Sequence, residues 1–316
     1  MSLPEALRNS QRFVCLYGTT PPRADTSDEK ALRAAERLHA RTHALPLDGI
    51  VVYDIQDEGQ RTGVERPFPF LPVRESRAYA RTLHEITGRP IICYKCIGNA
   101  TLEGWRHWLA SSLEDYGLES LSIVGRASSR QASDGIRMSE AMIEAAGAQR
   151  EHPDRGLILG GVAIPERHTA ERSESLRLIE KISLGCEYFI SQAVYAPGIV
   201  VRMLKDYSAD CARLGVAPAR IVLTFTPCGN ERTLAFMKWL GIAVAADSER
   251  AILAAQDPLS ESIRICAANL KQVLEEAGNT GIPLGINVES VSIRKDEIDA
   301  SIDLFHALMN VSTPNR

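Results

Sequence analysis

The sequence contains no block of like charges. Its 36 basic and 40 acidic side chains are spread over 316 residues and leave a formal net charge of −4. A protein that binds nucleic acid needs clustered lysine and arginine side chains to contact the phosphates. The charge pattern therefore argues against a nucleic-acid partner and favours a small-molecule substrate.

Long apolar runs are missing as well. No stretch approaches the roughly 20 consecutive apolar residues of a membrane-spanning helix. The opening segment MSLPEALRNSQRF also lacks the apolar core of a secretory signal. We therefore expect a cytoplasmic protein with no membrane partner. The sequence leaves open whether the chain forms a homo-oligomer.

Cysteine is scarce and odd in number. The seven cysteines are scattered through apolar segments, a distribution typical of reduced, buried thiols and not of a disulfide framework. Cys93 and Cys96 form a CxxC motif, but residues three apart on a strand point to opposite faces. We therefore interpret them as structural cysteines, in preference to a zinc site or a reactive thiol.

The sequence does contain a regular alternation of short apolar runs and amphipathic stretches. Eight runs are rich in valine and isoleucine and too short for helices: 13–17, 49–53, 90–97, 120–124, 156–163, 188–191, 220–224 and 283–288. Helical periodicity is found at 27–43, 102–116, 137–148, 170–184, 197–214, 231–240, 258–277 and 295–308. These units predict a single (β/α)8 TIM barrel over residues 1–316, in preference to an open doubly wound sheet.

Chemistry in such a barrel takes place where the strands end, so polar residues at these positions are candidates. Asp54 belongs to an acidic loop after the second strand and is either a general acid or a solvated surface charge. Glu289 faces the barrel mouth if it shares a face with Asn287, and otherwise lies on the surface. Arg126 after the fourth strand either binds a substrate anion or pairs with a carboxylate of the acidic loop.

Two further features stand at strand ends. Gln192 closes an apolar strand, and its amide can pair with both donor and acceptor edges of a heterocycle. The segment 65–72 holds two phenylalanines and three prolines. It is either a lid or aromatic wall at the mouth, or a loop docked on a neighbouring helix.

The block GGVAIPERHTAERSESLRLIEKISLGCEYFISQAVY resembles the methylenetetrahydrofolate reductase family. Its Pro-Glu-x-His, its helix ending in a lysine and its strand closing on a glutamine all match. Weaker matches, which fall in the same order as in the family, are Pro21-Pro22-Arg23, Tyr53, Gly125 and Pro227. The resemblance implies a flavin-dependent oxidoreductase on a (β/α)8 barrel, with FAD as cofactor, NAD(P)H as electron donor and a folate or related heterocycle as substrate.

The same resemblance implies roles for individual residues. His168, Glu174 and Lys181 fall where the family contacts the FAD phosphates and ribose, and Gly125 falls in the cofactor-binding turn. Glu174 and Lys181 also lie on one helical face, where the alternative is a solvated stripe of charges. The resemblance places Gln192 on the pterin ring and Tyr53 beside the substrate. Arg126 is a departure, because it stands where the family has an aspartate close to the flavin ring and the folate, and we expect it to bind an anionic part of the substrate.

The departures from the family are as informative as the matches. Gly18 stands where the family has the glutamate that protonates the substrate nitrogen, and glycine has no proton to give. Three polar flavin contacts are replaced by Val52, Cys93 and Ile164. If the chain is a reductase, the acid must come from elsewhere, with Asp54 as first candidate and Glu289 as second. The alternative is a flavin-free barrel enzyme, or a folate-binding or regulatory protein that has lost the reaction.

Overall fold

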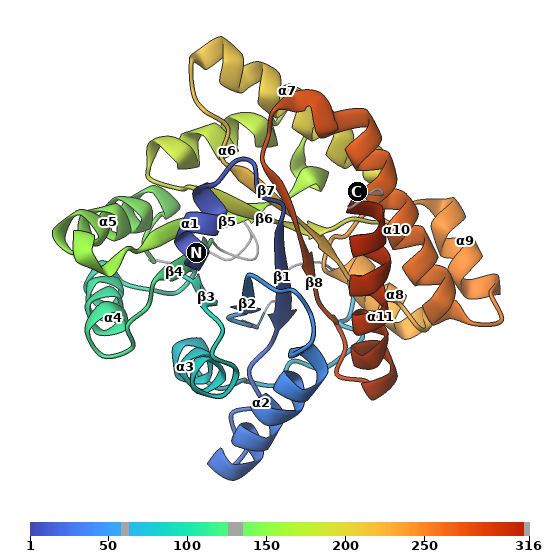
Figure 1. Cartoon of the computed structure of the whole chain (residues 1–316), viewed down its shortest axis with the longest axis horizontal. Helices are drawn as coiled ribbons and strands as arrows, with labels where there is room; N and C mark the ends of the chain where they lie inside the picture. Colours follow the sequence, from blue (N-terminus) through green and yellow to red (C-terminus); the bar gives the residue numbers. More distant parts are fainter. Residues whose placement is uncertain (58–62, 126–134, 313–316) are drawn as a thin grey trace.

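The computed structural model describes residues 1–57, 63–125 and 135–312. Eight parallel strands close into one barrel in sequence order, each hydrogen-bonded to its neighbours, and helices surround them (Figure 1). The strands are β1 (Val14–Thr19), β2 (Gly49–Val52), β3 (Ile91–Cys96), β4 (Ser120–Val124), β5 (Ile158–Ala163), β6 (Tyr188–Ala193), β7 (Arg220–Phe225) and β8 (Leu284–Val288). The predicted (β/α)8 TIM barrel is confirmed.

The helices are α1 (Leu3–Arg8), α2 (Asp28–Thr42), α3 (Ser76–Thr87), α4 (Leu102–Glu114), α5 (Met138–Glu151), α6 (Glu174–Ser183), α7 (Pro197–Leu214), α8 (Glu231–Trp239), α9 (Ala246–Ala254), α10 (Pro258–Ala277) and α11 (Lys295–Ser312). Periodicity did not predict α1, α3 or α9. Helix α1 has six residues, and α9 buries only Ile252. Too few apolar positions repeat in α1 and α9 to produce a pattern, whereas α3 buries Tyr79, Ala80 and Leu83 at helical spacing and was not recognised.

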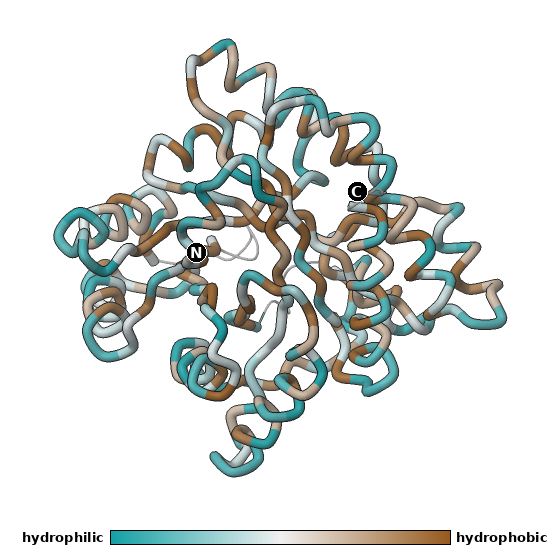
Figure 2. Tube along the Cα trace, in the orientation of Figure 1, coloured by the Kyte–Doolittle hydropathy of each residue, from teal (hydrophilic) through white to brown (hydrophobic). Residues whose placement is uncertain are grey.

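The core has two parts, one inside the barrel and one between the strands and the helices. Side chains alternate along each strand, so Val14 and Leu16 point inward while Cys15 and Tyr17 pack against the helices. Apolar residues accordingly follow the strands, and polar residues the outer turns of the helices (Figure 2). Six of the seven cysteines are buried, as the sequence predicts. Among the described residues, no helix is long and apolar enough to cross a membrane.

Helix α1 closes the amino-terminal end of the barrel. Leu3 and Leu7 pack on the interior cluster, and Ser2 and Glu5 cap the start of the helix reciprocally. The Arg220 guanidinium, 1% exposed, donates hydrogen bonds to the backbone carbonyls of Ala6, Leu7, Asn9, Arg12 and Leu284. Burial lowers the pKa of Arg220 to about 10, so the side chain stays charged at neutral pH.

Candidate functional site

Glu289 lies at the centre of a polar cluster at the carboxyl end of the barrel. It follows β8, two residues after Asn287, so both side chains point inward. Asn287 Nδ2 donates a hydrogen bond to the Tyr53 hydroxyl (2.8 Å), and a longer one to Thr224 Oγ1 (3.3 Å). The Glu289 carboxyl group lies beside the Tyr53 hydroxyl and the Asn287 amide, and both side chains interact with it electrostatically. Tyr53, which follows β2, and Asn287 of β8 thus meet at one carboxylic acid, and Thr224 of β7 binds the Asn287 amide from behind.

The cluster occupies space that Gly18 leaves on β1. A Cβ atom at this position would lie 2.8 Å from both the hydroxyl oxygen and Cε2 of Tyr53, and 3.1 Å from Glu289 Cβ. Contacts below 3 Å force an atom to move. Gly18, which in the sequence looks like the loss of an acid, therefore makes room for the carboxyl group of Glu289 at the end of the neighbouring strand β8.

Burial raises the pKa of Glu289 to about 7, although the neighbouring Tyr53 hydroxyl and Asn287 amide favour its ionised form. A carboxyl group of this kind holds its proton near neutral pH and can release it within the working range of an enzyme. The elevated pKa makes Glu289 a candidate general acid.

Glu289 should also make the stability of the folded chain depend on pH. The carboxyl is ordinarily half-protonated at 4.5 and in the folded chain at about 7, so its contribution is complete below 4.5 and lost as pH rises through 7. By pH 8 the free energy of unfolding should have fallen by at most about 3 kcal/mol for this reason. Glu289→Gln has no carboxyl group to titrate, so its stability should lack this dependence on pH. Urea unfolding from pH 4 to 8 measures it. Parallel curves for wild type and Glu289→Gln, with exposed Glu275→Gln as control, would contradict the raised pKa of Glu289.

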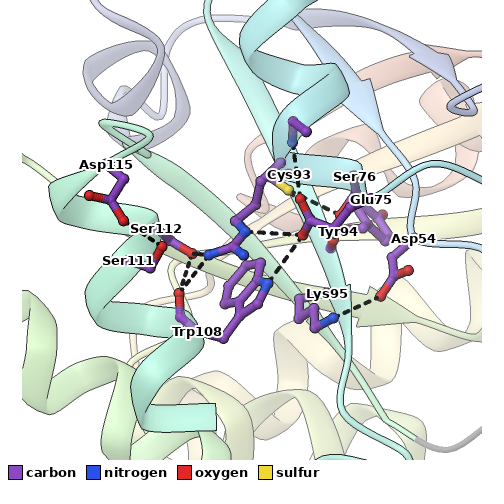
Figure 3. A network of polar contacts seen from close by, with 12 residues as sticks. Asp54, Glu75, Ser76, Cys93, Tyr94, Lys95, Trp108, Ser111, Ser112 and Asp115 are labelled. Atoms are coloured by element: carbon purple, nitrogen blue, oxygen red, sulfur yellow. Dashed lines mark hydrogen bonds and ion pairs between the residues drawn. The ribbon is translucent and has the colours of Figure 1, made fainter. Parts of the chain in front are cut away.

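Asp54 accepts hydrogen bonds from the backbone N–H of Cys96 (2.8 Å) and from the Gln56 amide (2.7 Å). Lys95 Nζ lies 3.8 Å away and sits over the Trp108 ring, as Figure 3 shows. This carboxylate is an acceptor that fastens the end of β2 to β3. We therefore place Glu289 before Asp54 as the proton donor.

Gln192 lies at a β-bulge in β6. The β6–β7 register shifts between Ile190 and Ala193, and Ser191 Oγ accepts the hydrogen bond of the Thr224 N–H (3.0 Å). The Gln192 amide donates to the Leu240 carbonyl at 2.6 Å. Gln192 therefore holds the end of α8 in this structure.

The three residues proposed to contact FAD engage the protein itself. Glu174 accepts a hydrogen bond from the Ile164 N–H (3.0 Å), and Lys181 donates to the Val162 carbonyl (2.8 Å). The one-face spacing of Glu174 and Lys181 thus aligns α6 along β5. His168 Nε2 pairs with Asp206 (2.8 Å), and its side chain is 7% exposed.

These contacts decide how well the three residues fit a flavin. The second oxygen of Glu174 and Nδ1 of His168 lack a hydrogen-bond partner among the described residues, but both atoms are enclosed by protein. A pyrophosphate needs exposed donors. This arrangement does not fit the contacts that the resemblance implies, and we assign no chemical step to a flavin.

The remaining predicted residues are spread around the rim. Tyr53 belongs to the Glu289 cluster described above. Gly125 directly follows β4, and its carbonyl lies 3.3 Å from Cys96 Sγ. Arg126 lies outside the described residues. A hollow of about 690 Å³ lies at the opposite, amino-terminal end, between Arg12 and Met309, away from all of these positions.

The segment 63–72, here named the strap, docks on α8. Phe68 packs edge-on against Phe236 at 5.2 Å, the Arg66 guanidinium lies 5.0 Å from the Trp239 ring centroid, and Arg232 donates to the Pro67 carbonyl. The strap, which lies between β2 and β3 in the sequence, therefore packs on the helix that follows β7. Of the two alternatives, docking on a helix is found, and the helix is the one that follows β7.

A solved structure with a related sequence matches the chain along nearly its whole length. It is an uncharacterised protein from Clostridium thermocellum that binds two copies of 5-methyl-5,6,7,8-tetrahydrofolic acid. The two sequences are 33% identical, the TM-score is 0.78, and the match covers 96% of this chain and 97% of that chain. The chain belongs to the family of this Clostridium thermocellum protein.

Other comparisons add nothing to this family assignment. No protein-family model matches the chain, and no curated protein matches it. N-(5′-phosphoribosyl)anthranilate isomerase from Pyrococcus furiosus is 13% identical, with a TM-score of 0.45 over 94% of this chain and 98% of that chain. A 2,3-dimethylmalate lyase is also 13% identical, with a TM-score of 0.49 over 90% and 76%.

In this family member, sequence reasoning named Tyr53 and Glu289 but did not connect them. It used Asn287 only for its spacing from Glu289 and gave Thr224 no role. A fully buried asparagine in an apolar strand is the signal that could have found the cluster, because its amide needs partners there.

Proposed function

We propose that the chain binds a reduced folate at the carboxyl ends of the barrel strands and acts on it as an oxidoreductase of the methylenetetrahydrofolate reductase type. The observation that carries the folate is the full-length relative that binds 5-methyltetrahydrofolate. The candidate acid at the strand ends supports chemistry at that place, where (β/α)8 barrels hold their active sites.

Glu289 supplies the proton in the proposed reaction. Its carboxyl group donates to a bridging nitrogen of methylenetetrahydrofolate, whose bond to the methylene carbon breaks and leaves an iminium ion. A hydride then reduces the methylene carbon to methyl. The reductant that we propose is NAD(P)H, which becomes NAD(P)+ as the iminium becomes methyltetrahydrofolate. Glu289 recovers its proton from water.

Gln192 is the residue that we propose for pterin recognition. Its amide already presents hydrogen-bonding atoms at the bulge beside the strand ends. A pterin edge carries donors and acceptors that an amide matches in pairs. Binding through this side chain would compete with its contact to Leu240, so Gln192→Ala should weaken folate binding and loosen the end of α8 together.

Folate binding is the first test of this proposal. Titration of the purified chain with 5-methyltetrahydrofolate in a calorimeter should give saturable binding, and NADH or NADPH should be oxidised when methylenetetrahydrofolate is added. Glu275→Gln, an exposed substitution on α10, is the control and should behave as wild type. Absence of saturable binding would overturn the proposal.

A folate-binding protein without turnover is the second candidate, favoured by Gly18 in place of the family's acid. It predicts binding without nicotinamide oxidation. The flavin implied by the resemblance has a direct test too. A yellow protein as purified, losing its colour in Lys181→Ala, would show that these side chains contact FAD after all.

A further inference from the structure

We infer that Tyr53 is a positioning residue whose hydroxyl, seated in the space left by Gly18, holds the Glu289 carboxyl group at the mouth of the barrel. Its chemical purpose, the orientation of a proton donor, rests on the proposed function. The arrangement itself is a property of the folded chain without ligand.

The hydrogen-bond direction at the Tyr53 hydroxyl carries the argument. A phenol has one proton to donate, and its oxygen also accepts. Asn287 Nδ2 donates to this oxygen at 2.8 Å, so the phenol proton is free to be donated to the Glu289 carboxyl group. The chain Asn287 to Tyr53 to Glu289 therefore fixes one orientation of the acid.

Packing fixes the ring as well as the hydroxyl. Tyr94 meets the Tyr53 ring edge-on, with ring centroids 4.8 Å apart at an angle of 74°. On the opposite side, the missing side chain of Gly18 leaves room for Cε2 and the hydroxyl. Tyr53 thus fills a place defined by β1 and β3, and its hydroxyl cannot move away from Glu289 without losing these contacts.

The same geometry makes a side chain at position 18 and the cluster mutually exclusive. A Cβ there would lie 2.8 Å from the Tyr53 hydroxyl oxygen and 3.1 Å from Glu289 Cβ. Gly18→Glu would therefore displace Tyr53 and would not simply add a second acid. In this chain an acid directly after β8 requires a glycine on β1.

Tyr53→Phe tests the inference, because it removes the hydroxyl and keeps the ring. The titration of Glu289 is followed in the ligand-free chain by the infrared band of its protonated carboxyl, assigned by its loss in Glu289→Gln. Without the donor, the titration midpoint should rise by about one pH unit, or about tenfold in proton affinity. Among the described residues, the ionisable side chains that interact with Glu289 are Tyr53, Tyr94 and Tyr17, all neutral in this range.

Tyr94→Phe is the matched control, because it keeps the ring that packs on Tyr53 and removes a hydroxyl that, among the described residues, makes no hydrogen bond to Glu289. It should leave the midpoint of Glu289 unchanged. Gly18→Ala should raise the midpoint as Tyr53→Phe does, since its methyl group displaces the hydroxyl. An unmoved midpoint in either Tyr53→Phe or Gly18→Ala, with the fold intact by circular dichroism, overturns the inference.

Turnover separates this inference from the proposed function. In Tyr53→Phe the pH profile of kcat should move with the Glu289 midpoint while KM for the folate changes little. Because the titration needs no folate, a chain that titrates as expected and binds no folate supports the positioning role and contradicts the proposed function alone.

Discussion

Glu289→Gln should lower kcat for the reduction of methylenetetrahydrofolate by about 10²- to 10⁴-fold, the range expected when a general acid is removed. Glutamine keeps the size of the side chain and can still hydrogen-bond to Tyr53 and Asn287, but it has no acidic proton. The affinity for 5-methyltetrahydrofolate should change much less, because that ligand needs no proton. Steady-state kinetics and calorimetry on the same preparation measure both quantities.

Asp54→Asn provides the comparison for this result. The variant removes a carboxylate that fastens the end of β2 to β3, so some loss of activity through misplacement is expected. Its kcat should nevertheless fall with rising pH around pH 7, as in the wild type, because Glu289 is intact. If Glu289→Gln kept the wild-type kcat, or if only Asp54→Asn lost the pH dependence of kcat near pH 7, the general acid would be Asp54 and not Glu289.

Arg220→Met should destabilise the fold by about 3 to 5 kcal/mol, which places it among the most damaging single substitutions. Methionine fills a similar volume but donates no hydrogen bond. Five carbonyls that Arg220 now satisfies would lose this donor, several of them in the buried end of the barrel. Urea unfolding followed by far-ultraviolet circular dichroism gives the change in free energy.

Arg8→Met is the control for the charge, because Arg8 pairs with Glu187 at the same end of the barrel but is 45% exposed. It should cost less than about 1 kcal/mol. Arg220→Lys should fall between the two, since an ammonium reaches fewer carbonyls than a guanidinium fork. Equal stability of Arg220→Met and Arg8→Met would contradict the anchoring role.

The barrel could be predicted from the sequence because its evidence is local. Each strand is a short valine- and isoleucine-rich run, and the predicted run at 120–124 coincides with β4. Strand ends then follow from the topology, which brought Glu289 into the candidate site through its spacing from Asn287. Both inferences need only neighbouring residues and the period of a strand.

The rest of the site depends on contacts between distant residues. Asp54 ranked first as the acid because the sequence of its loop does not indicate the hydrogen bond that it accepts from the backbone N–H of Cys96. Gly18 looked like a loss because the Tyr53 ring that fills its space comes from another strand. Glu174 and Lys181 share a helical face as expected, but that face follows the backbone of β5.

The Arg220 anchor also bears on the order in which the chain assembles. Arg220 lies more than 200 positions after the α1 carbonyls that it binds. A six-residue helix does not persist alone in water. We therefore expect α1 to dock on the barrel only after β7 has emerged from the ribosome, so that the amino-terminal end of the barrel closes late. The first segment to be made is among the last to reach its native place.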